Sequence, residues 1–304
     1  MMSELFPTFP IICYALTMSA IILDGRKVRD EILPELKARV VALEVVPTLA
    51  IIQVGDRPDS TSFIKAKKNF GEKIGVKIKH LQIPEMVPQK DMIDLVNECN
   101  ADKNIRGIIV QLPLPLALDK DAIIDAIQPE KDVDALTSFS VKRWLSGNEG
   151  AILPATIRGI RTLFRYYKIN LIGKKVTVIG RSTLVGKPIA SMCLNENATV
   201  TVCHSKTPNL AKETKEADII ISAAGKPGLV GKEHIRSGQI IIDVGINTIQ
   251  GQKLDDEIPG NKLVGDVDFE SVKGEVEAIT PVPGGVGPMT IVSLFENLLD
   301  LCER

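Results

Sequence analysis

A lysine on an otherwise apolar helix face is the first residue whose chemistry stands out. Residues 60–75 have a helical period, with Ser60 as a candidate N-cap and Gly75 as the C-terminal stop. The apolar stripe around Lys67 consists of Phe63, Ala66, Phe70 and Ile74. Such a lysine either extends its ammonium to water, the ordinary outcome, or presents an amine to a ligand.

Two polar residues are candidate partners of Lys67. Gln111 ends the apolar run 107–112, and ligands in open α/β sheets collect beyond the carboxyl ends of strands. Its amide could hold Lys67 and a ligand together, or it could satisfy backbone groups where the strand stops. Asp134, in the turn Lys131-Asp132-Val133-Asp134, suits a flat nitrogen heterocycle, although an ordinary turn aspartate fits as well.

A second site is indicated after the buried run at residues 175–180. Glycines in the segment 180–188 permit a tight turn, and Pro188 suits a first helical turn. The helix N-terminus that follows would favour a pyrophosphate. The segment has G-x-S and a longer spacer in place of G-x-G-x-x-G, so a simple turn from strand to helix is the alternative.

The next strand predicts which dinucleotide binds. It ends in Cys203-His204-Ser205-Lys206-Thr207, without the carboxylate that an NAD site normally places against the ribose 2′-hydroxyl. A 2′-phosphate could instead be surrounded by Arg181, Ser182, Ser205 and His204. NADP is therefore favoured over NAD, unless Ser205 and Thr207 only cap the following helix.

The elements that position these residues alternate along the chain. Helical periods cover residues 25–43, 60–75, 90–99, 157–168 and 290–302, and β-branched runs cover 49–54, 76–82, 107–112, 175–180, 199–203, 219–222 and 240–244. The 304 residues suit two domains of about 150 residues with a cleft between them. We expect an α/β fold in which an N-terminal catalytic domain precedes a C-terminal Rossmann-like domain, and the last helix returns to the first domain.

The pattern also predicts domain limits. Irregular chain at residues 128–156 marks the junction, which gives one domain from residues 19–155 and 280–304 and another from 156–279. Residues 1–18 form a predicted disordered extension: an apolar run at 10–16 lacks the preceding basic residue of a secretory signal, and Met18 offers a more conventional start.

Composition narrows the classes of partner and metal. A net charge of -1 provides no field to gather nucleic acid or anionic lipid, so neither a nucleic acid nor a membrane is expected as a partner. Five cysteines without a C-x-x-C pair, and three scattered histidines, argue against a metal site or a disulfide framework. This usage is typical of a reducing cytoplasm.

Together these segments resemble the bifunctional methylenetetrahydrofolate dehydrogenase/methenyltetrahydrofolate cyclohydrolase family over residues 19–302. The segments that carry the resemblance are Val54-Gly55-Asp56, Val110-Gln111-Leu112-Pro113-Leu114-Pro115, Lys131-Asp132-Val133-Asp134, Gly180-Arg181-Ser182 with Val185-Gly186-Lys187-Pro188, Cys203-His204-Ser205, Asp243-Val244-Gly245-Ile246-Asn247, Gly265-Asp266-Val267, and Thr280-Pro281-Val282-Pro283-Gly284-Gly285-Val286-Gly287-Pro288.

The resemblance implies an activity and roles for single residues. The enzyme would oxidise 5,10-methylenetetrahydrofolate with NADP and then hydrolyse the methenyl product to 10-formyltetrahydrofolate, within one-carbon metabolism and purine biosynthesis. Lys67 would be catalytic with Gln111 as its partner and Asp134 as the pterin anchor, and the family forms homodimers. Substrate would also contact Phe63, Val110, Leu112, Pro283, Gly284, Gly285 and Gly287, and NADP would contact Gly180, Arg181, Ser182, His204, Ser205 and Ile246.

The chain departs from the family pattern on the folate side. Phe63 replaces a tyrosine, Ala135 replaces a glycine, and Ala155 and Ile157 stand where the family has cysteine and proline. These changes leave two alternatives open: a dehydrogenase without efficient cyclohydrolase activity, and a folate- or NADP-binding protein without catalysis.

Overall fold

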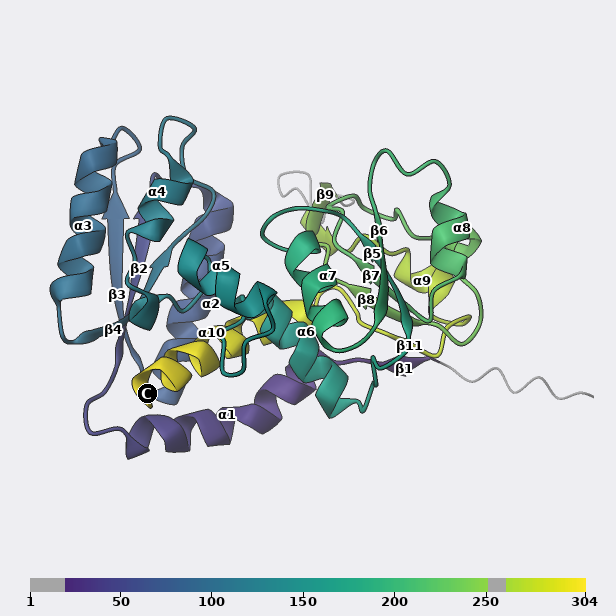
Figure 1. Cartoon of the computed structure of the whole chain (residues 1–304), viewed down its shortest axis with the longest axis horizontal. Coiled ribbons are helices and arrows are strands. Elements are labelled where there is room, and N and C mark those ends of the chain that lie inside the picture. Colours follow the sequence, from purple (N-terminus) through teal and green to yellow (C-terminus); the bar gives the residue numbers. More distant parts are fainter. Residues whose placement is uncertain (1–19, 251–260) are drawn as a thin grey trace, which may run out of the picture.

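The chain folds into two α/β domains joined by long helices (Figure 1). The computed structural model describes residues 20–250 and 261–304, so the expected extension at residues 1–18 lies outside the described residues. Two parallel sheets and one antiparallel hairpin account for the described strands.

The first domain has a three-stranded parallel sheet of order β3-β2-β4, with strands Lys77–Ile83, Thr48–Val54 and Ile105–Val110. Period-two alternation gives this sheet two apolar faces. Leu49, Ile51 and Ile109 belong to one hydrophobic cluster, while Ala50, Ile52 and Ile108 belong to another.

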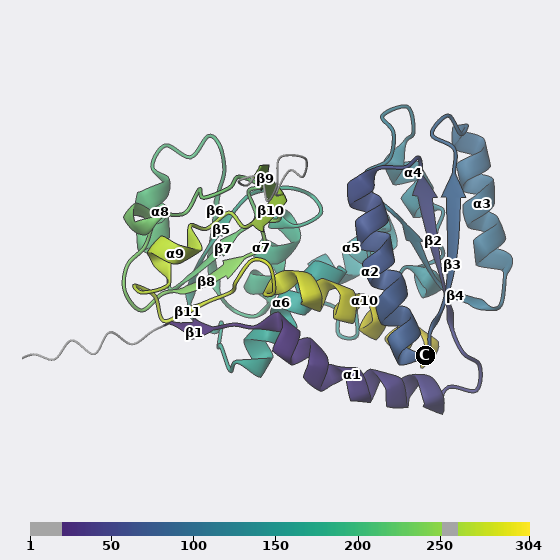
Figure 2. The ribbon, with the colours of Figure 1, turned by 180° about the vertical axis from the view of Figure 1, so that it is seen from behind.

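Each face is covered by its own helices. Helices α1 (Gly25–Ala42) and α2 (Pro58–Ile74) pack in the first cluster, and α3 (Gln89–Ala101) and α4 (Lys120–Asp125) pack in the second. Figure 2 shows α2 beside the sheet, with α1 leading from it toward the second domain. Both faces of the sheet are thus buried, as is usual for parallel strands.

The second domain contains a six-stranded sheet of order β1-β11-β8-β7-β5-β6, in which every pairing is parallel. The strands are Ile21–Ile22, Ala278–Ile279, Ile240–Asp243, Ile219–Ser222, Lys175–Ile179 and Thr199–Cys203. The strand order reverses at β5, and such a switch point leaves a crevice at the carboxyl ends of the strands.

Shorter elements complete this domain. They are helices α7 (Gly186–Asn195), α8 (Leu210–Lys215) and α9 (Phe269–Val272), the turn η2 (Lys232–His234), and the hairpin of β9 (Asn247–Gln250) with β10 (Asn261–Val264). Residues 128–156, which were expected to be irregular, contain η1 (Pro129–Lys131), which packs on β4 and α10, and α5 (Ser138–Leu145). The helix α6 (Ala155–Tyr166) follows them toward the second domain.

Helix α10 (Val286–Cys302) returns from the second sheet to the first domain (Figure 1). Its Phe295 ring lies 5.4 Å from that of Phe70 on α2. A Cβ at Gly107 of β4 would come within 2.7 Å of Leu298, so only glycine admits the helix this closely. The last helix therefore closes the first domain.

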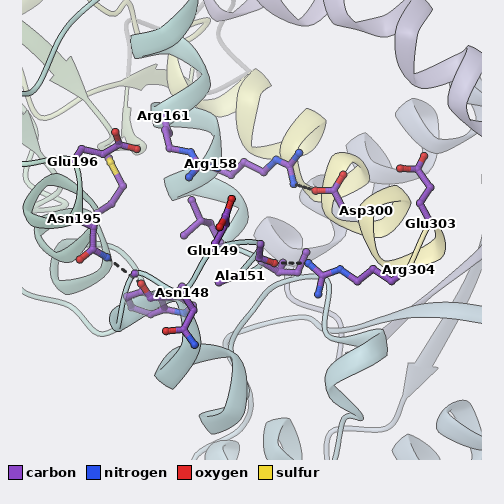
Figure 3. A pocket seen from close by; sticks show the side chains of 16 residues that line it. Asn148, Glu149, Ala151, Arg158, Arg161, Asn195, Glu196, Asp300, Glu303 and Arg304 are labelled. Carbon is purple, nitrogen blue, oxygen red and sulfur yellow. Dashed lines mark hydrogen bonds and ion pairs between the residues drawn. The ribbon is translucent and has the colours of Figure 1, made fainter.

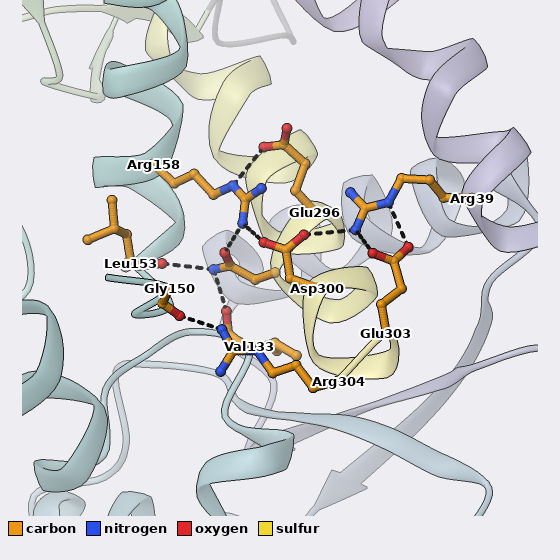
Figure 4. A network of polar contacts seen from close by, with 10 residues as sticks. Arg39, Val133, Gly150, Leu153, Arg158, Glu296, Asp300, Glu303 and Arg304 are labelled. Carbon is orange, nitrogen blue, oxygen red and sulfur yellow. Dashed lines mark hydrogen bonds and ion pairs between the residues drawn. The ribbon is translucent and has the colours of Figure 1, made fainter. Parts of the chain in front are cut away.

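A polar network ties α10 to α1 and α6 (Figure 4). Arg158 donates to Glu296, Asn297 and Asp300, while Arg39 pairs with Asp300 and Glu303 at 2.8 Å. Because Asp300 pairs with both arginines and so links the two sets of contacts, this network is worth more than an isolated surface pair.

Three further expectations from the sequence need correction. β1 pairs with β11, so residues 21–22 lie in the second sheet and outside the first domain; a two-residue edge strand carries no local sequence signal. Helix α2 begins at Pro58 with Arg57 as its N-cap, and not at Ser60, because the fixed φ of proline suits the first helical position. Helix α10 begins at Val286, earlier than residue 290.

Candidate active site

Lys67 lies between buried positions on α2. The buried face of the helix contains Ser60, Ile64, Phe70 and Ile74, and the Lys67 side chain is half-buried among them. The predicted stripe was partly wrong, because Phe63 is 46% exposed and Ile64 takes the buried position. The neighbouring Lys68 turns to another side, where its Nζ lies 2.9 Å from Nδ1 of His80.

Gln111 follows β4 directly and contacts Lys67. Its Oε1 accepts a hydrogen bond of 3.0 Å from Lys67 Nζ, and its Nε2 donates to the Leu112 carbonyl at 2.9 Å. The two interpretations of Gln111 were thus both right in part, since the amide holds the lysine and also satisfies a backbone group. Val110 is buried and Leu112 half-buried beside this pair.

Asp134 comes from a turn whose other residues are committed to structure. Asp132 forms a parallel bridge with Ile108 of β4, which extends the sheet edge, and its carboxylate accepts from the backbone of Leu136 and Thr137. Lys131 donates to three carbonyls at the end of α3, and the buried Asn297 donates to the Val133 carbonyl at 2.8 Å. Within the described part of the chain, Asp134 accepts no hydrogen bond.

Ala135 holds an unusual backbone conformation after this turn. Its φ is 54°, in the left-handed region where a Cβ is disfavoured by about 1–2 kcal/mol. A glycine would adopt this conformation without strain. The departure from the family pattern at Ala135 therefore retains the turn at a conformational cost.

Burial moves both ionisable groups toward their neutral forms. It lowers the pKa of the Lys67 amine below its ordinary value, and the attraction of Asp134 opposes this shift. Burial likewise raises the pKa of Asp134, against the attraction of Lys67. A lysine with a lowered pKa next to an amide is suited to general acid–base chemistry.

The Gly/Pro loop at residues 281–285 connects β11 to α10, so it starts at the carboxyl edge of the second sheet, and Gly287 follows it in the first turn of α10. Gly284 has a φ of 122°, and its carbonyl accepts from the backbone of Gly25 and Arg26 at 2.9 and 3.2 Å. Gly285 is buried, while Pro283 is exposed and Gly287 half-buried. No hydrogen bond among residues 20–250 and 261–304 joins this loop to Lys67.

The predicted cofactor turn lies at the switch point after β5. Gly180 has a φ of 120°, and a Cβ there would lie 2.2 Å from the Ala223 carbonyl oxygen, which follows the neighbouring β7. A Cβ at Gly186 would lie 2.4 Å from the Gly180 carbonyl oxygen. Glycine is therefore required at both positions to bring strand, turn and helix together.

Ser182 caps helix α7 from within this turn. Its Oγ accepts from the backbone N–H groups of Val185 and Gly186 at 3.2 Å, and its carbonyl accepts from Lys187. The serine of G-x-S thus satisfies donors that a pyrophosphate would otherwise meet at a helix N-terminus. Its hydroxyl proton stays available to an acceptor.

The β6 end lies beside this turn, because the Gly180 N–H donates to the Cys203 carbonyl at 2.8 Å. Arg181 and Ser205 are exposed there and His204 is half-buried. Thr207 Oγ1 accepts from the His204 N–H, and Asn209 caps α8, so neither Ser205 nor Thr207 caps that helix as the alternative required. The guanidinium of Arg181 and the hydroxyl of Ser205 are donors of the kind that a 2′-phosphate accepts.

Two buried aspartates near Ile246 were not predicted as site residues. Asp243 and Asp266 are 3% and 0% exposed, and Ile246 is 50% exposed at the carboxyl edge above them. Burial, together with the neighbouring Asp266, raises the pKa of Asp243 to about 6, although three backbone N–H groups oppose the shift. Their motifs Asp-Val-Gly and Gly-Asp-Val were visible in the sequence, but nothing local indicated that they meet.

A cavity of about 540 Å³ lies elsewhere, between α5, α6, α7 and the end of α10 (Figure 3). Its lining includes Arg158, Arg161 and Arg304 together with Glu149 and Glu196. No predicted site residue lines it. The chemistry-bearing residues therefore lie at the strand ends and not in this cavity.

Fold and sites define a two-domain enzyme in which a dinucleotide-binding sheet follows a domain that carries a lysine at its strand ends. The family model "Tetrahydrofolate dehydrogenase/cyclohydrolase, catalytic domain" matches residues 23–134, and the family's "NAD(P)-binding domain" matches residues 154–304. The chain belongs to the tetrahydrofolate dehydrogenase/cyclohydrolase family.

Relatives of similar length support this assignment. The "Bifunctional protein FolD" of Exiguobacterium is 42% identical over 288 residues, which cover 94% of this chain and 99% of the relative. The FolD structure from Campylobacter jejuni is 40% identical with a TM-score of 0.88, and covers 94% of this chain and 99% of that one. The Trypanosoma brucei FolD structure, complexed with NADP cofactor and an inhibitor, is 37% identical with a TM-score of 0.88 over 94% and 98% of the two chains.

Within residues 20–250 and 261–304, no helix has the length and apolar character needed to cross a bilayer.

Proposed function

We propose that the protein oxidises 5,10-methylenetetrahydrofolate to the 5,10-methenyl form with NADP, and hydrolyses that product to 10-formyltetrahydrofolate. The observation that carries the proposal is the hydrogen bond of 3.0 Å between Lys67 and Gln111 at the carboxyl edge of the first sheet. The names of the bifunctional relatives favour both activities over a dehydrogenase alone or a binding protein without catalysis.

Substrate binding falls to the carboxyl edge of the first domain. Asp134, free of other partners among the described residues, is suited to accept hydrogen bonds from the pterin ring. The exposed ring of Phe63 offers a stacking surface one helical turn before Lys67. Val110, Leu112, Pro283, Gly284, Gly285 and Gly287 would line the rest of the folate pocket.

The oxidation step needs alignment and no acid or base. NADP supplies the hydride acceptor when it is bound. The chain's own contribution is to hold the methylene carbon of the substrate, through Asp134, Gln111 and the glycine loop, in contact distance of the second domain's carboxyl edge. Gly180, Arg181, Ser182, His204, Ser205 and Ile246 would hold the cofactor.

The hydrolysis step uses Lys67 as a base. The methenyl substrate is cationic, and its charge would lower the pKa of the amine further in the same direction as burial. Neutral Lys67 then takes a proton from water as the water oxygen bonds to the methenyl carbon. The bond from that carbon to N5 breaks and N5 is protonated, which leaves the formyl group on N10 and releases one proton overall.

Gln111 has a positioning role in this step. Its Oε1 fixes the direction of the Lys67 amine, and the bond from its Nε2 to Leu112 prevents the amide from turning. Such orientation matters because a displacement of about 1 Å costs about 100-fold in rate.

Assembly, location and domain limits complete the proposal. We propose a homodimer in the cytoplasm, with the family's shared behaviour and the ordinary charge balance as support. Residues 156–279 would form the NADP domain, and residues from about 24 to 155 with 280–304 the folate domain.

Assays of both half-reactions test the function directly. Purified protein given methylenetetrahydrofolate and NADP should form the methenyl and then the formyl product, and NAD should be a poorer acceptor. Accumulation of methenyl at its uncatalysed hydrolysis rate would remove the second activity, and absence of both products would refute the proposal.

A further inference from the structure

The carboxylate of Asp266 collects donors from three segments of the second domain. It is fully buried, and it receives no ion pair from the described residues. The five donors are Ala224 N (2.7 Å), Gly225 N (3.1 Å), Lys226 N (2.8 Å), Ser222 Oγ (3.2 Å) and Asn247 Nδ2 (3.0 Å). A carboxylate has about four lone-pair sites, so this one is saturated.

Asp243 holds Asp266 in place from the neighbouring strand end. Its carboxylate accepts from the backbone of Gly245 (2.9 Å), Asp266 (3.0 Å) and Val267 (2.9 Å). The two aspartates face each other's glycines: a Cβ at Gly265 would lie 1.8 Å from Asp243 Oδ2, and one at Gly245 would lie 2.3 Å from Asp266 Oδ1. Asp-Val-Gly and Gly-Asp-Val thus form one reciprocal unit.

This unit determines the shape of two loops at the cofactor edge. The loop at residues 223–228 bonds to Asp266 through three successive N–H groups, and its Ala223 lies against Gly180 of the cofactor turn. Ile246 stands between Gly245, which bonds to Asp243, and Asn247, which bonds to Asp266. Residues 224–228 are exposed above the unit, so their bonds to Asp266 are what fixes that loop, whereas Gly245 is buried and Asn247 also pairs with Val264 in the β9–β10 hairpin.

We propose that Asp266, supported by Asp243, is the positioning residue that preorganises the 223–228 and 245–247 loops for NADP. The inference rests on the proposed function, because it assigns that edge to the cofactor. The physical basis is the fraction of molecules whose loops already have the conformation that binds NADP. If this fraction falls, the apparent Kd for NADP rises by its inverse. The first domain is not involved, so hydrolysis of methenyltetrahydrofolate, which needs no cofactor, is spared.

The test replaces Asp266 with its amide. Asp266→Asn removes the charge and turns one acceptor into a donor that faces backbone N–H groups. We expect the Kd for NADP, measured by calorimetry, to rise about 10- to 100-fold, while kcat/KM for hydrolysis stays within about twofold. Hydrogen exchange should report faster deuterium uptake in peptides that cover residues 223–228.

The matched control is Asp218→Asn. Asp218 also accepts a backbone N–H, from Lys175 at 3.0 Å, but it lies at the amino edge of the same sheet. This variant should leave NADP affinity, hydrolysis and exchange at residues 223–228 unchanged. A similar rise in Kd for Asp218→Asn would show that any loss of a carboxylate acts through general destabilisation, and would overturn the proposal.

Ser222→Ala keeps the proposal testable if Asp266→Asn does not fold. Ser222 is fully buried and cannot touch a ligand, yet it donates to Asp266. Loss of one hydrogen bond should raise the Kd about 2- to 10-fold. An unchanged Kd in the folded variants, or a parallel loss of hydrolysis, would overturn the inference. Failure of the unsubstituted protein to bind NADP would instead refute the proposed function.

Discussion

The aspartates at the proposed folate and cofactor sites differ in how many hydrogen bonds they accept. Asp134 has no hydrogen-bond donor within the described residues, and burial raises its pKa, whereas Asp266 accepts five donors. Saturated buried carboxylates stabilise a loop conformation, while an unpaired one has capacity left for a ligand. In the first domain, Asp134 is therefore available to bind a ligand. In the second domain, Asp266 uses its acceptors to hold the neighbouring loops in one conformation.

The largest effect on activity should come from replacing Lys67 in the first domain. Lys67→Met keeps the length of the side chain and removes the base, so methenyl hydrolysis should fall by about 100- to 10,000-fold. Calorimetric NADP affinity should not change. Lys65→Met, on the exposed face of the same helix, is the control and should keep full hydrolysis. Equal losses in both variants would remove Lys67 from the mechanism.

The second largest effect is expected in the second domain, at the cofactor turn. Gly180→Ala places a Cβ 2.2 Å from the Ala223 carbonyl oxygen, so the free energy of unfolding should fall by about 1–3 kcal/mol and NADP binding should weaken. Gly228 has a positive φ of 63°, but no atom lies within 4 Å of a Cβ added there. The variant Gly228→Ala therefore measures the loss of stability that the backbone conformation alone causes. Denaturant unfolding compares them, and equal losses would contradict the contact argument.

A smaller change tests the departure at position 63. Phe63→Tyr restores the hydroxyl near Lys67 on an exposed ring, and we expect methenyl hydrolysis to rise by about 2- to 10-fold, the value of one hydrogen bond. Oxidation should be unaffected. Single-turnover measurements of oxidation and of hydrolysis would show the difference. An equal change in the rates of both steps would mean that residue 63 acts only by stacking on the substrate.

The pH dependence of hydrolysis gives the finest test of the Lys67 and Asp134 pair. The neutral amine is the active form, so kcat should rise with pH as Lys67 loses its proton. Because Asp134 raises the pKa of Lys67, Asp134→Asn should lower that pKa and move the rise to lower pH. If the rise in kcat moves to higher pH in this variant, or does not move, Asp134 does not raise the pKa of Lys67.

Lys67 also contributes to stability, with a sign that its lowered pKa determines. A lysine whose pKa is lowered on folding binds fewer protons in the native than in the unfolded state, so its contribution to stability increases as pH rises from the lowered value toward 10.5. Chemistry at Lys67 is therefore obtained at the expense of stability near neutral pH.

Periodicity and motif spacing determined most of the architecture. Alternating β-branched runs and helical periods are local properties, so the helix at residues 25–43 and the strands at 175–180 and 199–203 closely match α1, β5 and β6. The missing carboxylate after β6 is equally local. From it the sequence alone favours NADP.

Only the tertiary structure decided which polar groups are free. Gln111 bonds to Lys67 and Leu112, Ser182 caps α7, and Asp243 and Asp266 bond to loops far away in sequence. The two-residue β1 joins the second sheet for a similar reason, since pairing with β11 specifies it and its own residues do not. Donor satisfaction and edge pairing depend on distance in space, which residue types and spacing do not encode.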